Sequence, residues 1–432
     1  MPSTIPTASL RWSLLALGVL SLLGCPLAES INLGDNSTPK KDNGVGTVTT
    51  IESPKALPVK IRVATFNIKE LSLENLTLVD ESGRGASEQT LAAAEVIQTI
   101  RPDVLLINEI DHDYTTTGSS GETLASTLAL FNSNYLNQGA QAINYVHFYA
   151  APCNTGMLSG MDLDNDGTIS TEAELRTRPH GNDSFGYGEY PGQYSMGILS
   201  KYPLDLENTR TFQKFLWKDL PGNHLPTEWY SEEEQVSFRL SSKSHWDVPV
   251  LLPNGARLHL FASHPTPPVF DGEEDRNGRR NFDEVRFWAE YINNNPALYD
   301  DAGQKGGFTG KAPFVILGDL NADEKSDPIY TGEVAIQTLL KHPRVVDHHQ
   351  FTQSVGGLQG REAGAPNFWE RATADFLNGA RVDYVLASDN LKVNGGGVHW
   401  PDPVTEPAAN FVALKASDHR LVWLDVELPA AK

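Results

Sequence analysis

The sequence predicts an α/β layered sandwich in which two packed β-sheets are covered by helices. From Val59 onward, short β-rich or apolar segments of strand length recur along the chain, with helical patterns between some of them. The 432 residues are 40% hydrophobic and 21% charged, which is enough apolar material for a large core. This composition excludes a disordered, collagen-like or coiled-coil chain.

The first 24 residues predict an export signal. Arg11 is the only charged residue there, and the eleven-residue apolar run from Ser13 to Leu23 is too short to span a bilayer comfortably. Leu22-Leu23-Gly24-Cys25 resembles the lipobox of bacterial lipoproteins, whose cysteine is lipidated, whereas cleavage near Ala28 would leave a free protein. We therefore expect a periplasmic, cell-surface or secreted protein that meets the membrane only through an N-terminal lipid anchor.

Residues 25–58 predict a flexible linker, because they are polar, rich in Gly, Pro, Ser and Thr, and without periodicity. Residues 59–432 then form the folded domain. We expect its strands at 60–68 and 104–110, followed by NYVHFYA, YSMGILS, RLHLFAS, PFVILGD, VDYVLAS and LVWLDVEL.

Two helices are predicted between these strands. Ser87 is placed to cap a helix that runs through Ile100, and a second helix has apolar spacing at Val285, Trp288, Ala289 and Ile292. Three polar, Gly-rich stretches, near 115–140, 151–192 and 350–375, predict insertions on the rim of the sandwich.

Charge and cysteine content exclude several classes of protein. The net charge is −21 and the pI about 4.9, which argues against a broad basic face for nucleic acid but not against an enzyme whose metal ions supply positive charge locally. The two cysteines are Cys25 and Cys153, so a cysteine-based zinc site is excluded. If Cys25 is lipidated or removed, Cys153 has no intramolecular partner.

Polar side chains cluster where predicted strands begin or end. They are Asn67, Glu109, Asp319, Asn321, Asp383, Asp418 and His419. Any one of them could be an ordinary turn or cap residue. Together they combine oxygen ligands with a histidine, which is typical of a site for Mg²⁺, Mn²⁺ or Ca²⁺.

The motifs TFNI, INEI, GDLNA, RVDYV and SDH occur in this order at those strand ends. In this combination the chain resembles the endonuclease/exonuclease/phosphatase superfamily over roughly residues 60–428. The resemblance implies a DNase-like, four-layer sandwich with two packed mixed β-sheets flanked by helices. It also implies a metal-dependent hydrolase of phosphoric esters, while nucleic acid, phospholipid and small organic phosphates all stay open as substrates.

The resemblance also implies a role for each polar residue. Three residues would coordinate the metal or lie in its immediate surroundings: Asn67, Glu109 and Asp418. Asp319 and Asn321 would orient the attacking water and the scissile phosphate. His419 would act as general base, or as a protonated phosphate contact, with Asp383 holding its imidazole. A histidine paired with a buried carboxylate has the pKa range and the orientation for either role.

His264 follows the strand RLHLFAS and resembles a histidine that contacts or protonates the phosphate in the deoxyribonuclease and sphingomyelinase branches. The alternative is a histidine that caps a Pro-rich turn. Arg276, Arg279 and Arg280 are expected in a charged loop before a helix at Phe282. They could clamp a phosphate or pair with neighbouring acidic residues, so we leave them out of the catalytic set.

Asp162, Asp164 and Asp166, followed by Gly167, resemble the start of an EF-hand calcium loop. The twelfth position is Ala173, so the closing bidentate ligand is out of register. We expect a Ca²⁺-stabilised surface loop here, and the alternative is a solvated acidic turn.

The function expected from the sequence is that of an exported, monomeric phosphoesterase with Mg²⁺ or Mn²⁺ at its active site, acting on a phosphate-ester substrate. The alternative is a non-catalytic, calcium-binding module at the cell surface on the same scaffold. A degenerate module would have lost part of the polar set, whereas Glu109, Asp319, Asn321, Asp383, Asp418 and His419 are all present.

Overall fold

The computed structural model of the protein describes residues 57–114, 124–326, 330, 332–359, 369–376 and 379–431. The export signal, Cys25 and all but the last two residues of the linker lie outside these ranges, so those expectations stay predictions. Within these ranges, no helix is long and apolar enough to cross a membrane.

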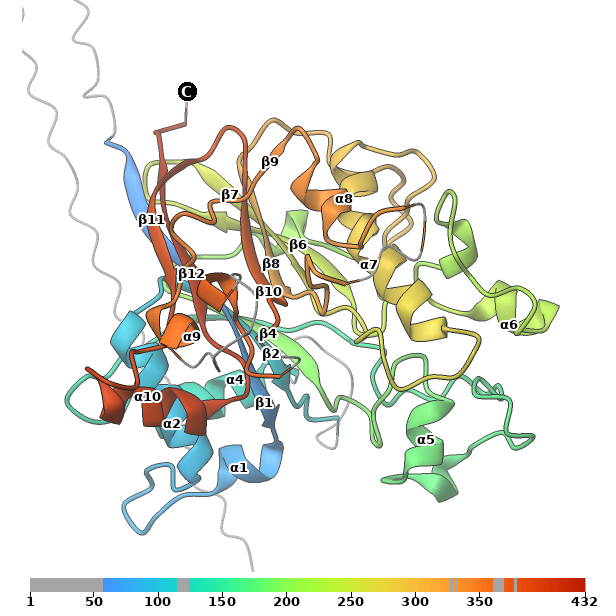
Figure 1. Ribbon diagram of the computed structural model, residues 1–432, viewed down its shortest axis with the longest axis horizontal. Helices are drawn as coiled ribbons and strands as arrows, with labels where there is room; N and C mark the ends of the chain where they lie inside the picture. Colours follow the sequence, from blue (N-terminus) through green and yellow to red (C-terminus); the bar gives the residue numbers. More distant parts are fainter. Residues whose placement is uncertain are drawn as a thin grey trace, which may run out of the picture. The chain divides into compact units, whose positions relative to one another are not determined.

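The described strands form two mixed sheets of six strands each (Figure 1). The first sheet has the order β11 (Lys392–Val398), β12 (Val422–Leu428), β1 (Val59–Leu71), β2 (Val104–Ile110), β4 (Ser195–Ser200) and β3 (His147–Tyr149). The second has the order β5 (Arg210–Thr211), β6 (His245–Leu251), β7 (Arg257–Ser263), β8 (Phe314–Asp319), β10 (Asp383–Ser388) and β9 (Val345–Val346). In each sheet one central pair is parallel, β1 with β2 and β7 with β8.

Apolar side chains from both sheets meet in one buried cluster that includes Val63, Leu106, Trp246, Leu317 and Val385. The outer face of the first sheet is covered by α2 (Glu88–Ile100) and α10 (Pro407–Ala416), and that of the second by α7 (Arg276–Ile292) and α8 (Gln337–Leu340) (Figure 1). The predicted four-layer sandwich is thereby confirmed.

The remaining helical segments are short. They are α1 (Leu73–Thr77), α4 (Ser126–Phe131), η1 (Asn132–Leu136), η2 (Glu172–Glu174), α5 (Arg178–Asn182), η3 (Leu206–Asn208), η4 (Trp217–Asp219), α6 (Glu232–Ser237), α9 (Val355–Gln359) and η5 (Trp369–Arg371).

All eight predicted strands are present, as β1, β2, β3, β4, β7, β8, β10 and β12. Both predicted helices are also confirmed. Ser87 caps α2, its hydroxyl accepting the N–H of Thr90 at 3.4 Å, and the helix ends at Ile100. In α7 the predicted apolar positions are buried against the second sheet.

Helix α10 and the two-residue strands β5 and β9 were not predicted, and three further features differ from the prediction. Strands β6 and β11 were not expected, because Pro249 and the run Gly395 to Gly397 are typical strand breakers. The expected loop at Arg276 to Arg280 is wrong, since α7 already begins at Arg276. Within the expected insertion near 115–140, of which residues 115–123 lie outside the described ranges, residues 126–136 are helical, and Leu128 and Phe131 are fully buried in the core.

Candidate active site

Most of the predicted catalytic and metal-binding residues line one cavity of about 870 Å³ at strand ends of both sheets, while Asn67 and Asp383 are hydrogen-bonded to residues of its lining. Its lining includes Glu109 from the first sheet and Asp319 from the second, together with His264, Asp418 and His419. The chain therefore brings together residues that are up to 310 positions apart in the sequence.

Irregular backbone at the ends of β1 and β2 turns Glu109 towards this cavity. The pairing of the two strands passes from Asn67 opposite Asn108 to Leu71 opposite Ile110, so three residues of β1 lie against Glu109 alone. Lys69, Glu70 and Glu109 all have positive φ, of 45°, 53° and 64°. Such a bulge re-aims a side chain, and here the N–H of Glu70 holds the Glu109 carboxylate at 3.0 Å.

A close approach of two strands positions Asp319 at the end of β8. Gly318 has φ 144°, and a Cβ atom there would lie 2.0 Å from the carbonyl oxygen of Ser263 at the end of β7. Only glycine fits this position. Just beyond it, Asn321 has φ 50° and its N–H donates to Oδ1 of Asp319 at 2.9 Å.

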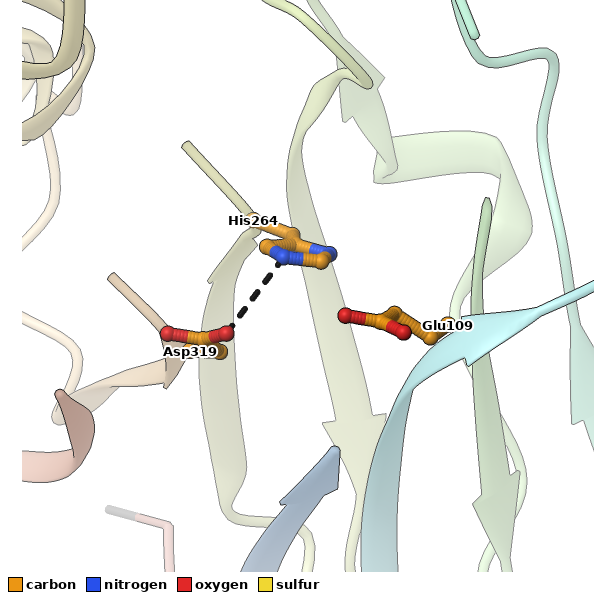
Figure 2. Close-up of side chains that lie close together, drawn as sticks. All are labelled: Glu109, His264 and Asp319. Atoms are coloured by element: carbon orange, nitrogen blue, oxygen red, sulfur yellow. Dashed lines mark ion pairs between the residues drawn. The ribbon is translucent and has the colours of Figure 1, made fainter. Parts of the chain in front are cut away.

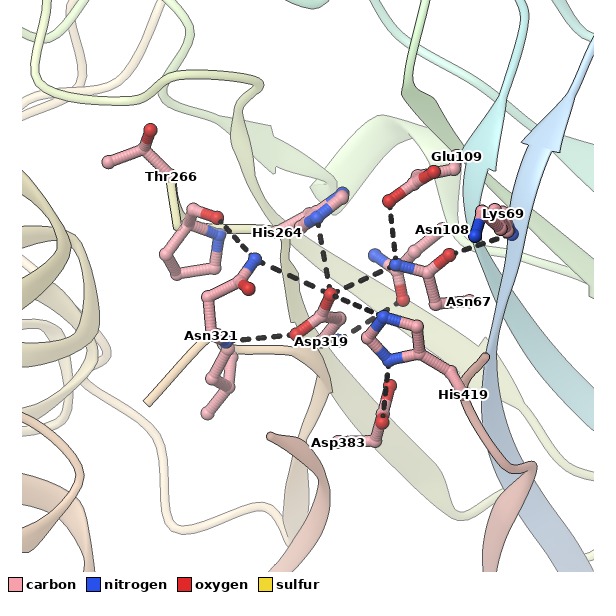
Figure 3. A network of polar contacts seen from close by, with 12 residues as sticks. Asn67, Lys69, Asn108, Glu109, His264, Thr266, Asp319, Asn321, Asp383 and His419 are labelled. Atoms are coloured by element: carbon pink, nitrogen blue, oxygen red, sulfur yellow. Dashed lines mark hydrogen bonds and ion pairs between the residues drawn. The ribbon is translucent and has the colours of Figure 1, made fainter. Parts of the chain in front are cut away.

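Two histidines face the other oxygen of Asp319. Nε2 of His264 lies 3.4 Å from Oδ2 of Asp319, and Nε2 of His419 lies 3.8 Å from the same atom (Figures 2 and 3). Nδ1 of His419 is bonded to Oδ2 of Asp383 at 2.9 Å. Asp383 is the cross-strand partner of Asp319 in the β8–β10 pair, so the sheet itself sets the distance between the two carboxylates.

The ionisable groups of the site shift one another's pKa values. Burial opposes ionisation of Asp319, but His419 and His264 outweigh it and hold the pKa of that carboxyl well below its usual range. Burial alone would lower the pKa of His419, yet Asp383 and Asp319 raise it well above its ordinary value. Burial and the nearby Lys243 lower the pKa of His264. The two rings thus differ: the protein favours the imidazolium at His419 and the neutral ring at His264.

Asn67 links the carboxylates of the two sheets. Its Nδ2 donates to Oε1 of Glu109 and to Oδ2 of Asp319, each at 2.9 Å, while its Oδ1 accepts the N–H of Lys69 (Figure 3). One ligand atom each of Glu109, His264 and Asp319 lies within 4.8 Å of the others. Two carboxylates and an imidazole are a donor set that Mg²⁺ or Mn²⁺ accepts, so these residues fit a divalent cation.

Asp418, the third expected metal ligand, lies elsewhere on the cavity wall. Its Oδ2 accepts a hydrogen bond from Nζ of Lys69 at 2.8 Å, and it does not belong to the group formed by Glu109, His264 and Asp319. The structure therefore places His264 and Asp319 beside Glu109 in addition to Asn67, which was expected there.

Some residues of the site were not expected from the sequence. Oδ1 of Asn108 accepts the N–H of Asp319 at 3.2 Å, and Nδ2 of Asn281 donates to the carbonyls of Thr266 and Leu320. Asn108 stands inside the INEI motif, so its neighbour Glu109 was a signal for it. Lys243, which also lines the cavity, follows no motif.

The acidic loop at 162–167 partly matches the expected calcium site. Carboxylate oxygens of Asp162, Asp164 and Asp183 lie within 4.8 Å of one another. Asp166 is not in this group, since its Oδ1 accepts the N–H of Thr168 at 2.8 Å. The set of three carboxylates has the chemistry of a Ca²⁺ site, with Asp183 in the place expected for Asp166.

Comparison with known proteins identifies the family. A family model described as the endonuclease/exonuclease/phosphatase family matches residues 64–419. The chain belongs to this family. Its members are metal-dependent phosphoesterases, so this member is a hydrolase of phosphoric ester bonds.

Solved structures of similar proteins include an endonuclease/exonuclease/phosphatase from Beutenbergia cavernae, with 18% identity, 86% of this chain and 72% of that chain covered, and a TM-score of 0.45. The human nocturnin catalytic domain with bound sulfate has 14% identity, 86% and 93% coverage, and a TM-score of 0.43. A family protein from Leptotrichia buccalis has 12% identity, 85% and 100% coverage, and a TM-score of 0.42. Among curated proteins, none matches the sequence of this chain significantly.

Proposed function

We propose that the protein hydrolyses a phosphodiester or phosphomonoester by metal- and histidine-assisted attack of water. One observation carries this proposal: His419 is bonded to the buried Asp383 on one side and faces Asp319 on the other, in a cavity shared with Glu109 and His264. This is the arrangement that water activation next to a phosphate requires.

Each residue of the site has its own role in this mechanism. Nε2 of His419 takes the proton of the attacking water, while Asp383 holds Nδ1–H and stabilises the imidazolium that forms. Asp319 and Asn321 orient water and phosphate. His264, the neutral ring, lies 3.4 Å from Oδ2 of Asp319 and contacts the phosphate or the leaving group.

Glu109 and its neighbours would hold a divalent cation, whose positive charge would neutralise a phosphate oxygen when the cation is bound. Two of the carboxylates that raise the pKa of His419, Asp319 and Glu109, also belong to the group that fits this cation, whereas Asp383 does not. While the charges of Asp319 and Glu109 are uncompensated, the protein favours the imidazolium at His419, which then acts as a phosphate contact rather than as a base.

Removal of metal tests the proposal. EDTA should abolish hydrolysis of bis-p-nitrophenyl phosphate, and Mg²⁺ or Mn²⁺ should restore it, because the donor set consists of carboxylate and imidazole groups. A panel of DNA, RNA, sphingomyelin and phosphomonoesters then identifies the substrate. Full activity in a metal-stripped sample would contradict the mechanism.

Two finer proposals accompany this one. We propose that the acidic loop holds Ca²⁺ through Asp162, Asp164 and Asp183, which is supported by the grouping of their oxygens. We also propose that the protein is exported as a monomer and anchored through a lipid on Cys25, which is supported by the N-terminal sequence. A non-catalytic module would leave the assembled set of Asp319, Asp383 and His419 without a use, so we favour the enzyme.

A further inference from the structure

We propose that Lys243 is a substrate-binding residue whose ammonium group contacts a non-bridging oxygen of the scissile phosphate. This inference rests on the proposed function, since it concerns the same cavity. It adds a cation to a site otherwise described by carboxylates, amides and histidines.

The first observation is burial without an anionic partner. Lys243 is 6% exposed, and its ammonium group makes no hydrogen bond and no ion pair with any described residue. A buried ammonium without a counter-ion costs several kcal/mol or deprotonates, so proteins normally pair it. Here the open side of the group is the cavity, which Lys243 lines together with Glu109, His264 and Asp319.

Lys69 provides a contrast within the same cavity. Its side chain is 56% exposed and is bonded to Asp418 at 2.8 Å. That lysine is already neutralised by a carboxylate of the protein. Lys243 is the more buried of the two lysines, and its ammonium group remains available to bind a ligand.

The second observation is that the backbone around Lys243 is fixed. Its carbonyl accepts the N–H of Asn154 at 2.9 Å. The preceding Ser242 donates its N–H and its hydroxyl to the buried Glu284, at 2.6 and 3.0 Å. The other oxygen of Glu284 accepts the N–H of Thr266, two residues after His264. Glu284 therefore holds the segments that carry Lys243 and His264 in one position.

The third observation is the electrostatic setting. Burial lowers the pKa of Lys243, while Glu284, Glu109 and Asp319 oppose this. The carboxylate of Glu284 already accepts hydrogen bonds from Ser242 and Thr266. The carboxylates of Glu109 and Asp319 belong to the proposed cation site. Once those are engaged by a cation, the positive charge of Lys243 is uncompensated, and a phosphate oxygen in the cavity is the anion that fits it. A preorganised donor in a water-excluded site is worth most where charge builds up in the transition state.

Three variants test this: Lys243→Met, Lys243→Arg, and Lys341→Met as a control that removes the charge of a surface lysine, 58% exposed and paired with Glu333. With bis-p-nitrophenyl phosphate, Lys243→Met should lower kcat/KM roughly 10²-fold, the usual scale for losing one such donor. Lys243→Arg should retain more activity, and Lys341→Met should match the wild type. The free variant Lys243→Met should unfold at the same or a higher temperature, because a buried charge is gone.

Two binding measurements separate this role from others. In Mg²⁺, inorganic phosphate should raise the unfolding temperature of the wild type but not that of Lys243→Met, whereas Mg²⁺ alone should raise both. If phosphate stabilises both equally, the inference is overturned. It is also overturned if Lys243→Met loses the response to Mg²⁺, since the lysine would then organise the carboxylates only.

Failure of the proposed function is a separate result. If the wild type hydrolyses no phosphoric ester in the panel, that proposal fails. The phosphate-dependent shift in unfolding temperature still decides whether Lys243 binds the anion.

Discussion

One carboxylate oxygen of Asp319 faces two imidazole rings, and the surroundings of those rings make them unlike. His419 has Asp383 behind it, while Nδ1 of His264 is buried and has no hydrogen-bond partner among the described residues. A carboxylate hydrogen-bonded to Nδ1 favours the imidazolium form of a histidine, whereas burial without such a partner at Nδ1 favours the neutral ring. The two histidines therefore cannot substitute for each other.

Loss of the His419–Asp383 pair gives the first prediction. His419→Ala should lower kcat roughly 10²–10⁴-fold, the usual effect of losing a general base. Asp383→Asn should also be severe, and the double variant should be little worse than His419→Ala, because the two residues act as one unit. Steady-state kinetics on any accepted substrate measure this, and near-normal turnover by His419→Ala would show that the centre of the site is misassigned.

Glu109→Gln should behave differently, because Glu109 belongs to the cation site. Raising Mg²⁺ should recover part of its activity and none of that of His419→Ala. An equal response of the two variants to Mg²⁺ would remove the distinction between metal binding and proton transfer.

At this scale the sequence predicted which residues form the site but not what each one contacts. The strand-end motifs named Glu109, Asp319 and His419, which line one cavity, and Asp383, which is hydrogen-bonded to His419. That Asn67 links two carboxylates, and that Asp418 pairs with Lys69, depends on side-chain geometry across two sheets. No spacing along the chain encodes such contacts.

At the scale of the elements, the site depends on strands that end irregularly. Six of the described non-glycine residues with positive φ line the cavity: Lys69, Glu70, Glu109, Tyr194, Phe270 and Asn321. Such conformations cost free energy and persist where the surrounding structure fixes them. The bulge in β1 and the close approach at Gly318 are two examples, and both aim a carboxylate at the cavity.

Gly318→Ala should destabilise the protein by at least about 3 kcal/mol, because the new methyl group would overlap backbone of β7 and the φ of 144° is strained for alanine. Gly222→Ala is the matched control: its φ is 64°, but nothing lies within 4 Å, so strain alone should cost only about 1 kcal/mol. Chemical denaturation measures both. Equal losses would mean that the contact with Ser263 is unimportant.

The acidic loop gives a further prediction. Calcium at 100 times its Kd should stabilise the wild type by about 2.7 kcal/mol, since it binds only the folded loop. Asp164→Ala should abolish this effect, whereas Asp166→Ala, outside the group of three carboxylates, should largely keep it. An unfolding temperature of the wild type that does not respond to calcium would rule out the site.

Elements with a clear pattern were predictable, and those held by tertiary contacts were not. The β-rich segments and the capped helix at Ser87 follow from local rules. Strand β6 forms although it contains Pro249, because Trp246, Val248 and Val250 bury their side chains between the sheets. Burial outweighs local propensity there.

At the scale of the whole molecule, two buried histidines make the fold sensitive to acid. Burial lowers the pKa of both His112 and His245 to about 4. His245 is held between the hydroxyl of Ser241 and the carbonyl of Glu284, at 2.7 and 2.8 Å. Between pH 6.5 and 4 the unfolded chain binds protons at these rings and the native protein does not, so stability should fall as the pH falls through this window.

Each histidine should contribute up to about 3 kcal/mol to this loss, because one pKa unit corresponds to about 1.4 kcal/mol. Denaturation midpoints measured from pH 7 to pH 4 test the slope. His245→Gln should make the slope shallower, because the pKa difference of this ring between the folded and unfolded chain is then removed. A flat profile in the wild type would refute the prediction.

The first and last strands of the described fold are neighbours: β1 pairs with β12 from Val59 opposite Leu428 to Thr65 opposite Val422. Strand β12 begins three residues after His419, so one short segment supplies both an inner strand of the first sheet and a histidine of the proposed active site. The pairing of β12 with β1 and the approach of His419 to Asp383 are therefore coupled, and a variant that loosens β12 should lose the geometry of the site together with the order of the first sheet.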